Sequence, residues 1–387
     1  MRSRLVQSTG TNAGFKRAVL ALPVAGGGFS MQRYGHSLAD ALRDAGGSWS
    51  IDSFRPINAQ RLNPRTTLGH LQDIYQCYID YPLAVRRLKA DLVHIIDHGY
   101  GHLLLALRGV KTVVTCHDLI PWLGAIGEIP LAVPRRVQFS VLARLRCLRL
   151  ASHVVTDSKN TRKDLLRLMP QLESKISVVY PGVAIAFRPG DQARDQWQLR
   201  NKLAIEQNSR LLLHIGQDSY KNVGKVIEIL AVLKTRIKVP LKLIVTSPLS
   251  NEVHDKARQL EVSSLILKVS APDDQSLSEL YRGADVFVFP SWYEGFGWPP
   301  LEAMACGLPV VSSRAGSLAE VLGDEALLCD PSDTNGFARA IEQLLACPQL
   351  ARCRGAAGLK RAAAYSWKNT ARQILEIYHG ILALPDQ

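Results

Sequence analysis

The sequence predicts an α/β protein built from two doubly wound parallel sheets. Short apolar runs rich in β-branched residues alternate with stretches of helical periodicity along the chain. Strands that are separated by helices form parallel sheets, because the chain must cross back over a face of the sheet before the next strand. The length of 387 residues is sufficient for two domains with separate cores. The pattern breaks around residues 180–183, where we place the domain boundary.

The first half begins with a strand, a glycine-rich turn and a helix. The strand is expected at residues 18–22, the turn is AGGGFS at 25–30, and the helix follows over 30–43. A glycine-rich turn at this place lets the backbone approach a phosphate, although it can also serve simply to reverse the chain. The other strands expected in this half are at residues 92–96, 112–116, 154–156 and 176–179.

Polar residues follow three of these strands, where ligands collect in parallel sheets. They are Asp97-His98, His117 and Asp157-Ser158. Hydrogen bonds to neighbouring backbone are the commoner explanation of a lone histidine such as His117. Ser158 is expected to cap the following helix.

The second half is organised around residues 284–321. Strands are expected at residues 211–215, 243–245, 265–269, 286–289 and 309–312. Pro299 and Pro300 suit the first turn of a helix, whose N–H groups have no partners, and this helix is expected over 301–306.

Two glutamates belong to this organising stretch. Glu294 lies in the loop and Glu302 in the expected first helical turn. Carboxylates only accept hydrogen bonds, so Glu302 suits a vicinal diol such as a ribose and Glu294 a second polyol. The amides of Gly295, Phe296 and Gly297 are candidates for binding an anion. By contrast, Asp273-Asp274 is expected to cap a helix.

Composition excludes several classes of protein. An apolar content of 47% and a charged content of 21% are ordinary for a globular protein, and no apolar run is long enough to span a bilayer. Seven cysteines without close pairing argue against a disulfide framework and a zinc site. The basic first residues lack the apolar core of a secretory signal, so we expect a cytoplasmic protein.

The net charge of +13 is concentrated in the first half. Residues 1–183 carry 24 Lys and Arg against 12 Asp and Glu, whereas residues 184–387 carry 23 against 22. This asymmetry indicates an acidic partner such as an anionic membrane or a phosphate-bearing lipid carrier. Nucleic acid is disfavoured, because the basic residues are not interleaved with aromatic ones. A basic amphipathic helix over 134–150 suits either a membrane surface or packing on the sheet.

The run EGFGWPPLEAMACGLPVV at 294–311 resembles the signature of the retaining glycosyltransferases of family four. The resemblance implies the GT-B fold, in which two Rossmann-like domains face each other across a cleft. Residues 1–183 would form the acceptor-side domain and 184–365 the nucleotide-sugar domain. Residues 366–387 would form a helix that crosses back to the first domain.

The resemblance also implies roles for individual residues. Glu294 would orient the sugar and Glu302 would bind the donor. His117, in VVTCHDLIPW, matches a histidine that lies against the transferred sugar. Lys221, together with Gly216, matches the diphosphate site, and Gly26, Gly27 and Gly28 match a glycine loop beside the diphosphate. The chain departs from the family at Gln217 and Tyr220, where many members have arginine, which puts the strength of diphosphate binding in doubt.

The expected activity is transfer of a hexose from GDP-mannose or a UDP-sugar to a glycan or lipid-linked acceptor in cell-surface polysaccharide synthesis. No cofactor or metal is expected, because the sequence lacks an Asp-x-Asp motif. Peripheral contact with the inner face of the cell membrane is expected through the basic first domain. The alternatives are a non-catalytic protein that binds nucleotide sugars and, less consistent with the signature, a nucleotide-sugar epimerase.

Overall fold

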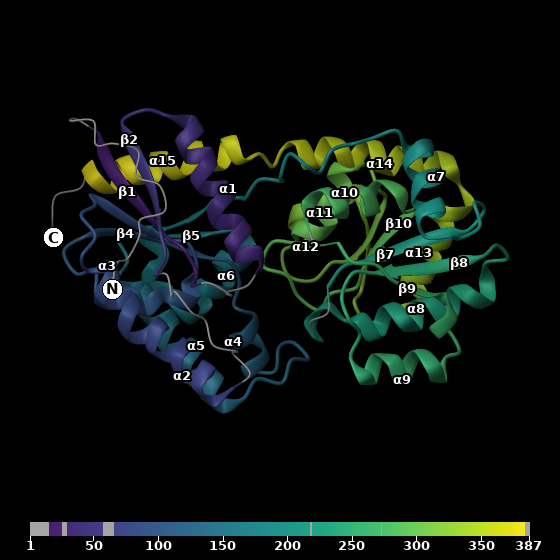
Figure 1. Ribbon diagram of the computed structural model, residues 1–387, viewed down its shortest axis with the longest axis horizontal. Helices are drawn as coiled ribbons and strands as arrows, with labels where there is room; N and C mark the ends of the chain where they lie inside the picture. Colours follow the sequence, from purple (N-terminus) through teal and green to yellow (C-terminus); the bar gives the residue numbers. More distant parts are fainter. Residues whose placement is uncertain (1–14, 25–28, 57–65, 217–218, 272, 384–387) are drawn as a thin grey trace. The chain divides into compact units, whose positions relative to one another are not determined.

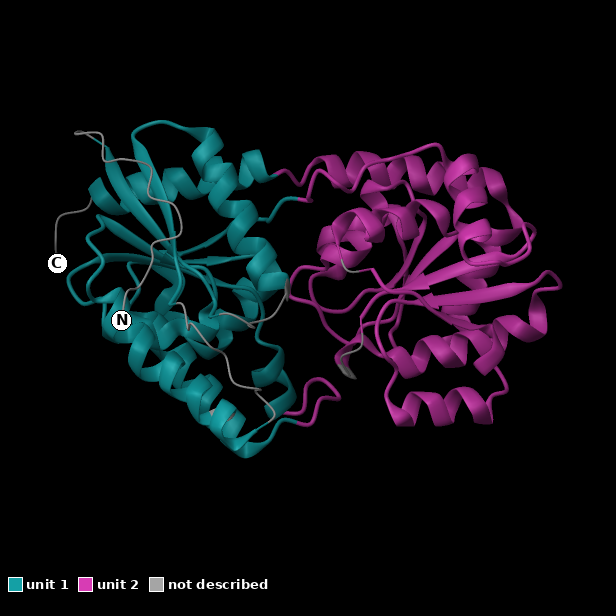
Figure 2. Cartoon of the chain, in the orientation of Figure 1, with its two compact units in different colours: residues 1–125, 133–182, 367–387 teal, residues 126–132, 183–366 magenta. Residues whose placement is uncertain are grey.

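The computed structural model describes residues 15–24, 29–56, 66–216, 219–271 and 273–383. The chain forms two compact units, which Figure 2 shows in different colours. Unit 1 comprises residues 1–125, 133–182 and 367–387, and unit 2 comprises residues 126–132 and 183–366. Each unit is built around its own six-stranded parallel sheet.

Unit 1 has the strand order β2-β1-β3-β4-β5-β6, and all of its strand pairs are parallel. The strands are β1 (Lys16–Ala21), β2 (Trp49–Phe54), β3 (Leu92–Ile95), β4 (Lys111–Cys116), β5 (His153–Thr156) and β6 (Ile176–Val178). Sequence analysis missed β2, because its sequence WSIDSF lacks an apolar run. Its buried Asp52 is stabilised by Arg17 of β1, whose Nε donates to Oδ2 at 2.7 Å.

Helices cover both faces of this sheet (Figure 1). They are α1 (Phe29–Ala45), α2 (Thr67–Tyr75), α3 (Tyr81–Val85), α4 (Ile120–Ala125), α5 (Arg135–Cys147), α6 (Lys159–Leu168) and α15 (Trp367–Ala383). A π-helical turn, η1 (Gln76–Asp80), joins α2 to α3, and the 3₁₀ segments are η2 (His98–Leu105), η3 (Leu148–Leu150) and η4 (Pro170–Lys175). α15 packs on α1, and its Tyr378 hydrogen-bonds His94 of β3 at 2.8 Å.

Unit 2 has the strand order β12-β11-β10-β7-β8-β9, again with all pairs parallel. The strands are β7 (Arg210–His214), β8 (Leu241–Val245), β9 (Ile266–Lys268), β10 (Val286–Phe289), β11 (Val310–Ser313) and β12 (Leu327–Cys329). Residues 286–289 are buried throughout, as expected for a strand covered on both faces. β12 was missed by sequence analysis.

The helices of unit 2 pack on both faces of its sheet (Figure 1). They are α7 (Gln192–Lys202), α8 (Val223–Arg236), α9 (Asn251–Gln259), α10 (Asp274–Gly283), α11 (Trp298–Ala305), α12 (Leu318–Leu322), α13 (Thr334–Ala346) and α14 (Pro348–Ala363). Three 3₁₀ turns are η5 (Ser219–Lys221), η6 (Ser263–Leu265) and η7 (Gly323–Glu325). A hydrophobic cluster joins β8 and β10 to α8 and α13 through Ile227, Leu243, Val288 and Phe337.

The predicted caps are present. Ser158 accepts a hydrogen bond from the amide of Thr161 at 3.0 Å, and Asp273 accepts one from that of Ser276 at 2.7 Å. None of the helices in the described part of the chain has the length and apolar character that a membrane crossing requires.

Candidate functional site

Lys221 and Glu294 meet beyond the carboxyl ends of β7 and β10 in unit 2. The Lys221 Nζ donates to Glu294 Oε1 at 3.0 Å, and the two side chains are only 12% and 9% exposed. The ammonium group lies 5.1 Å from the ring centroids of both Tyr220 and Phe289. Aromatic rings stabilise a cation over their faces, so the lysine is held by two rings and a carboxylate.

The segments that carry this pair are held together by backbone contacts. Trp292 N donates to Tyr220 O at 2.8 Å, and Ser291 Oγ reaches the same carbonyl at 3.0 Å. Gly216 has a φ of +123°, and a Cβ there would come within 2.8 Å of the Lys221 side chain. A larger residue at Gly216 would therefore displace the Lys221 side chain.

The loop 294–297 is held by Ser317. The Ser317 amide and hydroxyl both donate to Glu294 O at 3.0 Å, and the hydroxyl also lies 2.8 Å from Phe296 O. Gly316 has a φ of +60°, and a Cβ there would lie 2.5 Å from Glu294 O, so this close approach needs glycine. Ser291 Oγ donates to Glu294 Oε1 at 2.8 Å and fixes the carboxylate itself.

Gly297 is the N-cap of α11 and has a φ of +102°. The helix begins at Trp298, three residues earlier than predicted, so Glu302 lies in the second turn and not in the first. Pro299 and Pro300 carry no N–H, so backbone donors for an anion at this end come from the segment 295–298. The predicted anion-binding amides of Gly295 and Phe296 belong to this segment.

Glu302 is 2% exposed, and its Oε2 accepts a hydrogen bond from the hydroxyl of Tyr281 at 3.1 Å. Tyr281 belongs to α10, and sequence analysis did not identify it, because a tyrosine on a half-apolar helix carries no distinctive signal. The hydrogen bond fixes the orientation of the buried carboxylate.

His117 lies directly after β4 in unit 1, and both of its ring nitrogens face acceptors. Nδ1 is 2.5 Å from Asp157 Oδ2, and Nε2 is 2.7 Å from Ile96 O. A ring that donates from both nitrogens is an imidazolium. Burial lowers the pKa of His117, but the charge and hydrogen bond of Asp157 outweigh it and raise the pKa to about 9.

Other polar groups surround this histidine. Thr161 Oγ1 donates to His117 O at 3.1 Å, and the Tyr34 ring packs edge-on with its centroid 4.7 Å from the imidazole. Asp157 is 4% exposed, and its second oxygen, Oδ1, has no hydrogen-bond partner among the residues that the structure describes. Asp97, at the end of the neighbouring strand β3, accepts from Gly99 N at 2.7 Å. The ends of β3, β4 and β5 thus form one polar edge.

Several predicted residues lie outside the described part of the chain. These are Gly26, Gly27 and Gly28 of the first glycine-rich turn, and Gln217, which follows Gly216. Their roles stay predictions. Of the other predicted residues, Lys221, Glu294, Gly216 and the loop 295–297 come together in unit 2, and His117 belongs to unit 1.

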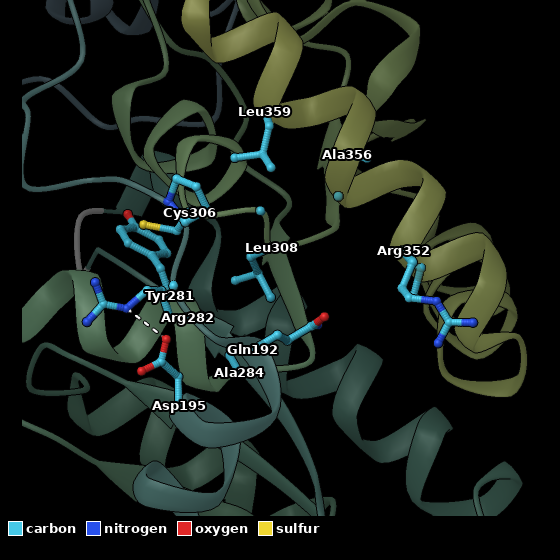
Figure 3. A pocket seen from close by; sticks show the side chains of 15 residues that line it. Gln192, Asp195, Tyr281, Arg282, Ala284, Cys306, Leu308, Arg352, Ala356 and Leu359 are labelled. Atoms are coloured by element: carbon cyan, nitrogen blue, oxygen red, sulfur yellow. Dashed lines mark ion pairs between the residues drawn. The ribbon is translucent and has the colours of Figure 1, made fainter.

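A cavity of about 200 Å³ lies elsewhere in unit 2 (Figure 3). Ala284, Gly307 and Leu308 line it, and they precede β10 and β11, so it opens at the amino ends of these strands. Arg282 points at Asp195 in this cavity, with 3.1 Å between Nε and Oδ2. The cavity is therefore distinct from the Lys221–Glu294 site at the carboxyl ends.

Comparison with known proteins identifies the family. Residues 195–361 match the family described as glycosyl transferases group 1, and residues 31–187 match glycosyltransferase family 4. The O-antigen chain mannosyltransferase B of Escherichia coli is 30% identical over 293 residues, which cover 74% of this chain and 75% of that protein. The chain belongs to glycosyltransferase family 4.

One further relative supports the assignment to this family, and one solved structure supports the fold. The serotype-specific mannosyltransferase WbdA of Escherichia coli is 27% identical over 313 residues, covering 78% of this chain but only 38% of WbdA. The chain thus spans well under half the length of WbdA. HepE of Anabaena, solved in complex with UDP-glucose, has a TM-score of 0.73 at 18% identity over 94% of this chain and 99% of HepE. The predicted GT-B fold class is confirmed by this likeness and by the two parallel sheets.

Proposed function

We propose that this glycosyltransferase is a retaining, metal-independent enzyme that moves a hexose from a nucleotide-diphosphate sugar to a glycan or lipid-linked acceptor in cell-surface polysaccharide synthesis. The observation that carries the proposal is the Lys221–Glu294 pair at 3.0 Å, held beyond the carboxyl ends of β7 and β10. Such strand ends are where ligands bind in open parallel sheets. A cation beside a carboxylate suits a ligand that presents both a phosphate and hydroxyl groups.

Lys221 is suited to the diphosphate. Its ammonium is a compact charge on a flexible stem, so that it can turn from Glu294 to a phosphate oxygen without rearrangement of the backbone. Glu294 is then available to accept hydrogen bonds from sugar hydroxyls, while Ser291 still holds its Oε1 at 2.8 Å. The charge that develops on the leaving diphosphate is stabilised by Lys221, which is the basis for proposing that no metal is needed.

The proposed reaction exchanges one bond at the anomeric carbon for another. The bond from that carbon to the diphosphate oxygen breaks, a bond to the acceptor oxygen forms on the same face, and the departing phosphate takes the acceptor proton. Glu294 orients and stabilises the sugar in this scheme and forms no covalent bond. His117, as an imidazolium whose two N–H groups are bound by Asp157 and Ile96, cannot accept a proton, so it contributes a positive charge.

Glu302 is proposed to bind the ribose of the donor. Its carboxylate is buried, and the hydroxyl of Tyr281 donates a hydrogen bond to Oε2 at 3.1 Å. A carboxylate only accepts hydrogen bonds, so Glu302 suits the two neighbouring hydroxyls of a ribose. Tyr281 would keep the carboxylate oriented in the absence of donor.

The choice of donor and acceptor rests on the relatives. Two of them are mannosyltransferases and HepE binds UDP-glucose, which supports GDP-mannose or a UDP-sugar as the donor. The O-antigen relative supports a glycan or lipid-linked acceptor. Positions 1–183 carry 24 basic and 12 acidic residues. This excess of positive charge supports a cytoplasmic protein with peripheral contact at the inner face of the membrane.

The test is a panel of nucleotide sugars in the presence of a chelator, read out by thermal shift and by slow donor hydrolysis. We expect stabilisation by one nucleotide family, lost in Glu302→Ala and in Lys221→Ala. Glu294→Gln should keep donor binding and lower turnover about 10²-fold, the size typical of losing one polar contact to the transition state. Glu252→Gln on the exposed face of α9 is the matched control and should behave as wild type.

Three results would count against the proposal. Full activity of Glu294→Gln would remove the residue from the mechanism. Absence of a response to every nucleotide would favour the non-catalytic alternative, for which the tyrosine at 220 in place of arginine is the supporting observation. A changed free nucleotide sugar in place of a glycoside would instead indicate an epimerase.

A further inference from the structure

The helical segment from α2 through η1 to α3 in unit 1 exposes apolar side chains along one face. Leu68 is 69% exposed, Leu71 56%, Tyr75 56% and Ile79 48%. These positions are separated by three or four residues, so they share one side of the helix. Surface helices normally place such a stripe against the core. Further exposed apolar residues of the segment are Ile74, Tyr78 and Leu83.

Helix α5 extends this apolar face. Tyr78 Oη lies 3.4 Å from Ser140 Oγ, which places η1 beside α5. Phe139, the neighbour of Ser140, is 73% exposed. We call the exposed sides of residues 67–85 and 135–147 the α2–α5 face. A contiguous apolar face of this kind marks an interaction site.

The same face is strongly basic. α5 contains four arginines and no acidic residue. Arg135 and Arg146 are exposed, and they lie four positions before and seven after Phe139, on the same side of the helix. Arg144 points inward instead, where its Nη1 donates to Gly99 O at 3.1 Å. Arg86, Arg87 and Lys89 are exposed beyond α3, whereas the two acidic residues of the segment, Asp73 and Asp80, are half-buried.

We infer that the α2–α5 face docks on the surface of an anionic lipid bilayer. The leucines, tyrosines and phenylalanine would enter the boundary between headgroups and acyl chains, and the arginines would contact lipid phosphates. A second copy of the chain fits less well. A two-fold interface brings the same patch of both subunits together and would place arginines against arginines. The net charge and residues 134–150 account only for electrostatic attraction to the membrane. The apolar stripe of α2 adds side chains that can insert into the bilayer.

The segment η2 connects the α2–α5 face to the polar edge at the ends of β3, β4 and β5 in unit 1. His102 of η2 lies 2.9 Å from Cys77 O of η1, and its ring packs on that of Tyr78 with the centroids 4.8 Å apart. η2 begins at His98, directly after Asp97 at the end of β3. A bilayer on the α2–α5 face would therefore hold a membrane-bound acceptor near the His117 edge, a consequence that rests on the proposed function.

The test is co-sedimentation of the full chain with vesicles of phosphatidylcholine alone or with 30 mol% phosphatidylglycerol, about the fraction that gives a bacterial-like surface charge. We expect binding to the anionic vesicles at low salt, weakened as salt rises. Arg135→Gln with Arg146→Gln should lower the partition coefficient at least about tenfold. Leu71→Ser with Phe139→Ser should lower it as much, because apolar insertion is lost.

Matched controls lie in unit 2. Trp197 is 58% exposed on α7, so Trp197→Ser removes comparable apolar area without touching the α2–α5 face. Arg194→Gln with Lys238→Gln removes two exposed charges there. Both variants should bind vesicles as wild type does. All the substituted side chains are exposed, so the melting temperature should stay unchanged.

The inference is overturned if the wild-type chain does not bind anionic vesicles at low salt, or if the unit 2 controls lose as much binding as the α2–α5 variants. A wild-type dimer in sedimentation velocity that dissociates in Leu71→Ser with Phe139→Ser, without vesicle binding, would assign the face to a second copy. Donor hydrolysis, which needs no membrane, should be unchanged in the α2–α5 variants. Loss of donor binding with vesicle binding retained would reject the proposed function and leave this face intact.

Discussion

At the scale of single residues, the His117–Asp157 pair shows how a neighbour sets the chemistry of a side chain. A fully buried histidine is normally neutral, because burial disfavours its charge. His94, which is also buried, follows this rule, and burial together with the charge of His117 lowers its pKa to about 3. His117 departs from it, because Asp157 lies 2.5 Å away and the pKa rises to about 9.

Asp157→Asn should therefore lower the pKa of His117. The amide oxygen of asparagine can still accept from Nδ1, but the opposite charge that stabilises the imidazolium is gone. Titration of the ring resonances by NMR should show the His117 midpoint well below 9, while His94 stays neutral. Asp118→Asn, whose carboxylate caps Ile120 N at 2.9 Å, is the control and should leave the midpoint in place. An unchanged midpoint in Asp157→Asn would mean that the charge of Asp97 and the Ile96 carbonyl suffice to hold the proton.

The candidate site was predictable where it depends on local motifs. Glu294, Glu302 and the glycines lie within one short run, and Lys221 follows a strand. The contacts that complete the site were not predictable, because they join distant parts of the chain. Lys221 and Glu294 are 73 positions apart, and Asp157 and His117 are 40 apart. Tyr281 and Ser317 carry no pattern that distinguishes them from core or capping residues.

At the scale of elements, the success of prediction followed the apolar pattern. Strands such as residues 286–289 are buried on both faces and need apolar side chains throughout, so they were found with the correct bounds. β2 was missed, because its buried Asp52 is balanced by Arg17 from another strand. The start of α11 was placed three residues late, because Trp298 lies before the prolines that mark the first turn.

The contact between α11 and α14 depends on a glycine, which allows a direct test. A Cβ at Gly355 of α14 would lie 2.4 Å from the backbone oxygen of Gly307, at the end of α11. Gly355→Ala should therefore lower the free energy of unfolding by about 1–3 kcal/mol, since the clash is with backbone. Denaturation by urea measures this change.

Gly380→Ala is the matched control within another helix. No atom of the described residues lies within 4 Å of a Cβ at Gly380 of α15, so alanine should stabilise the helix by about 0.5–1 kcal/mol. Opposite signs for the two substitutions are the expected result. Equal effects would show that helix propensity, and not the close approach of α11 to α14, decides the outcome at position 355.

At the scale of the whole molecule, buried histidines of opposite character give the stability a dependence on pH. His214 of β7 is fully buried, and burial, together with the charge of Lys221, lowers its pKa to about 4. His94 behaves in the same way in unit 1, with a pKa of about 3. Both histidines are neutral in the folded chain and bind a proton more readily once the chain unfolds, so acid favours unfolding. His117 has the opposite character, because its folded form binds the proton more tightly.

Stability should therefore fall on both sides of the ordinary histidine pKa of about 6.5. Below that value the unfolded chain takes up protons that His94 and His214 exclude, so the free energy of unfolding should decrease from pH 6.5 toward 4. Above it the unfolded chain releases the proton that His117 retains, so stability should decrease from pH 6.5 toward 9. Urea unfolding across this range measures both slopes. His117→Asn should flatten the alkaline slope and His214→Asn the acid slope, while His254→Asn on the exposed face of α9 should change neither. An alkaline slope that persists in His117→Asn would show that another group releases the proton.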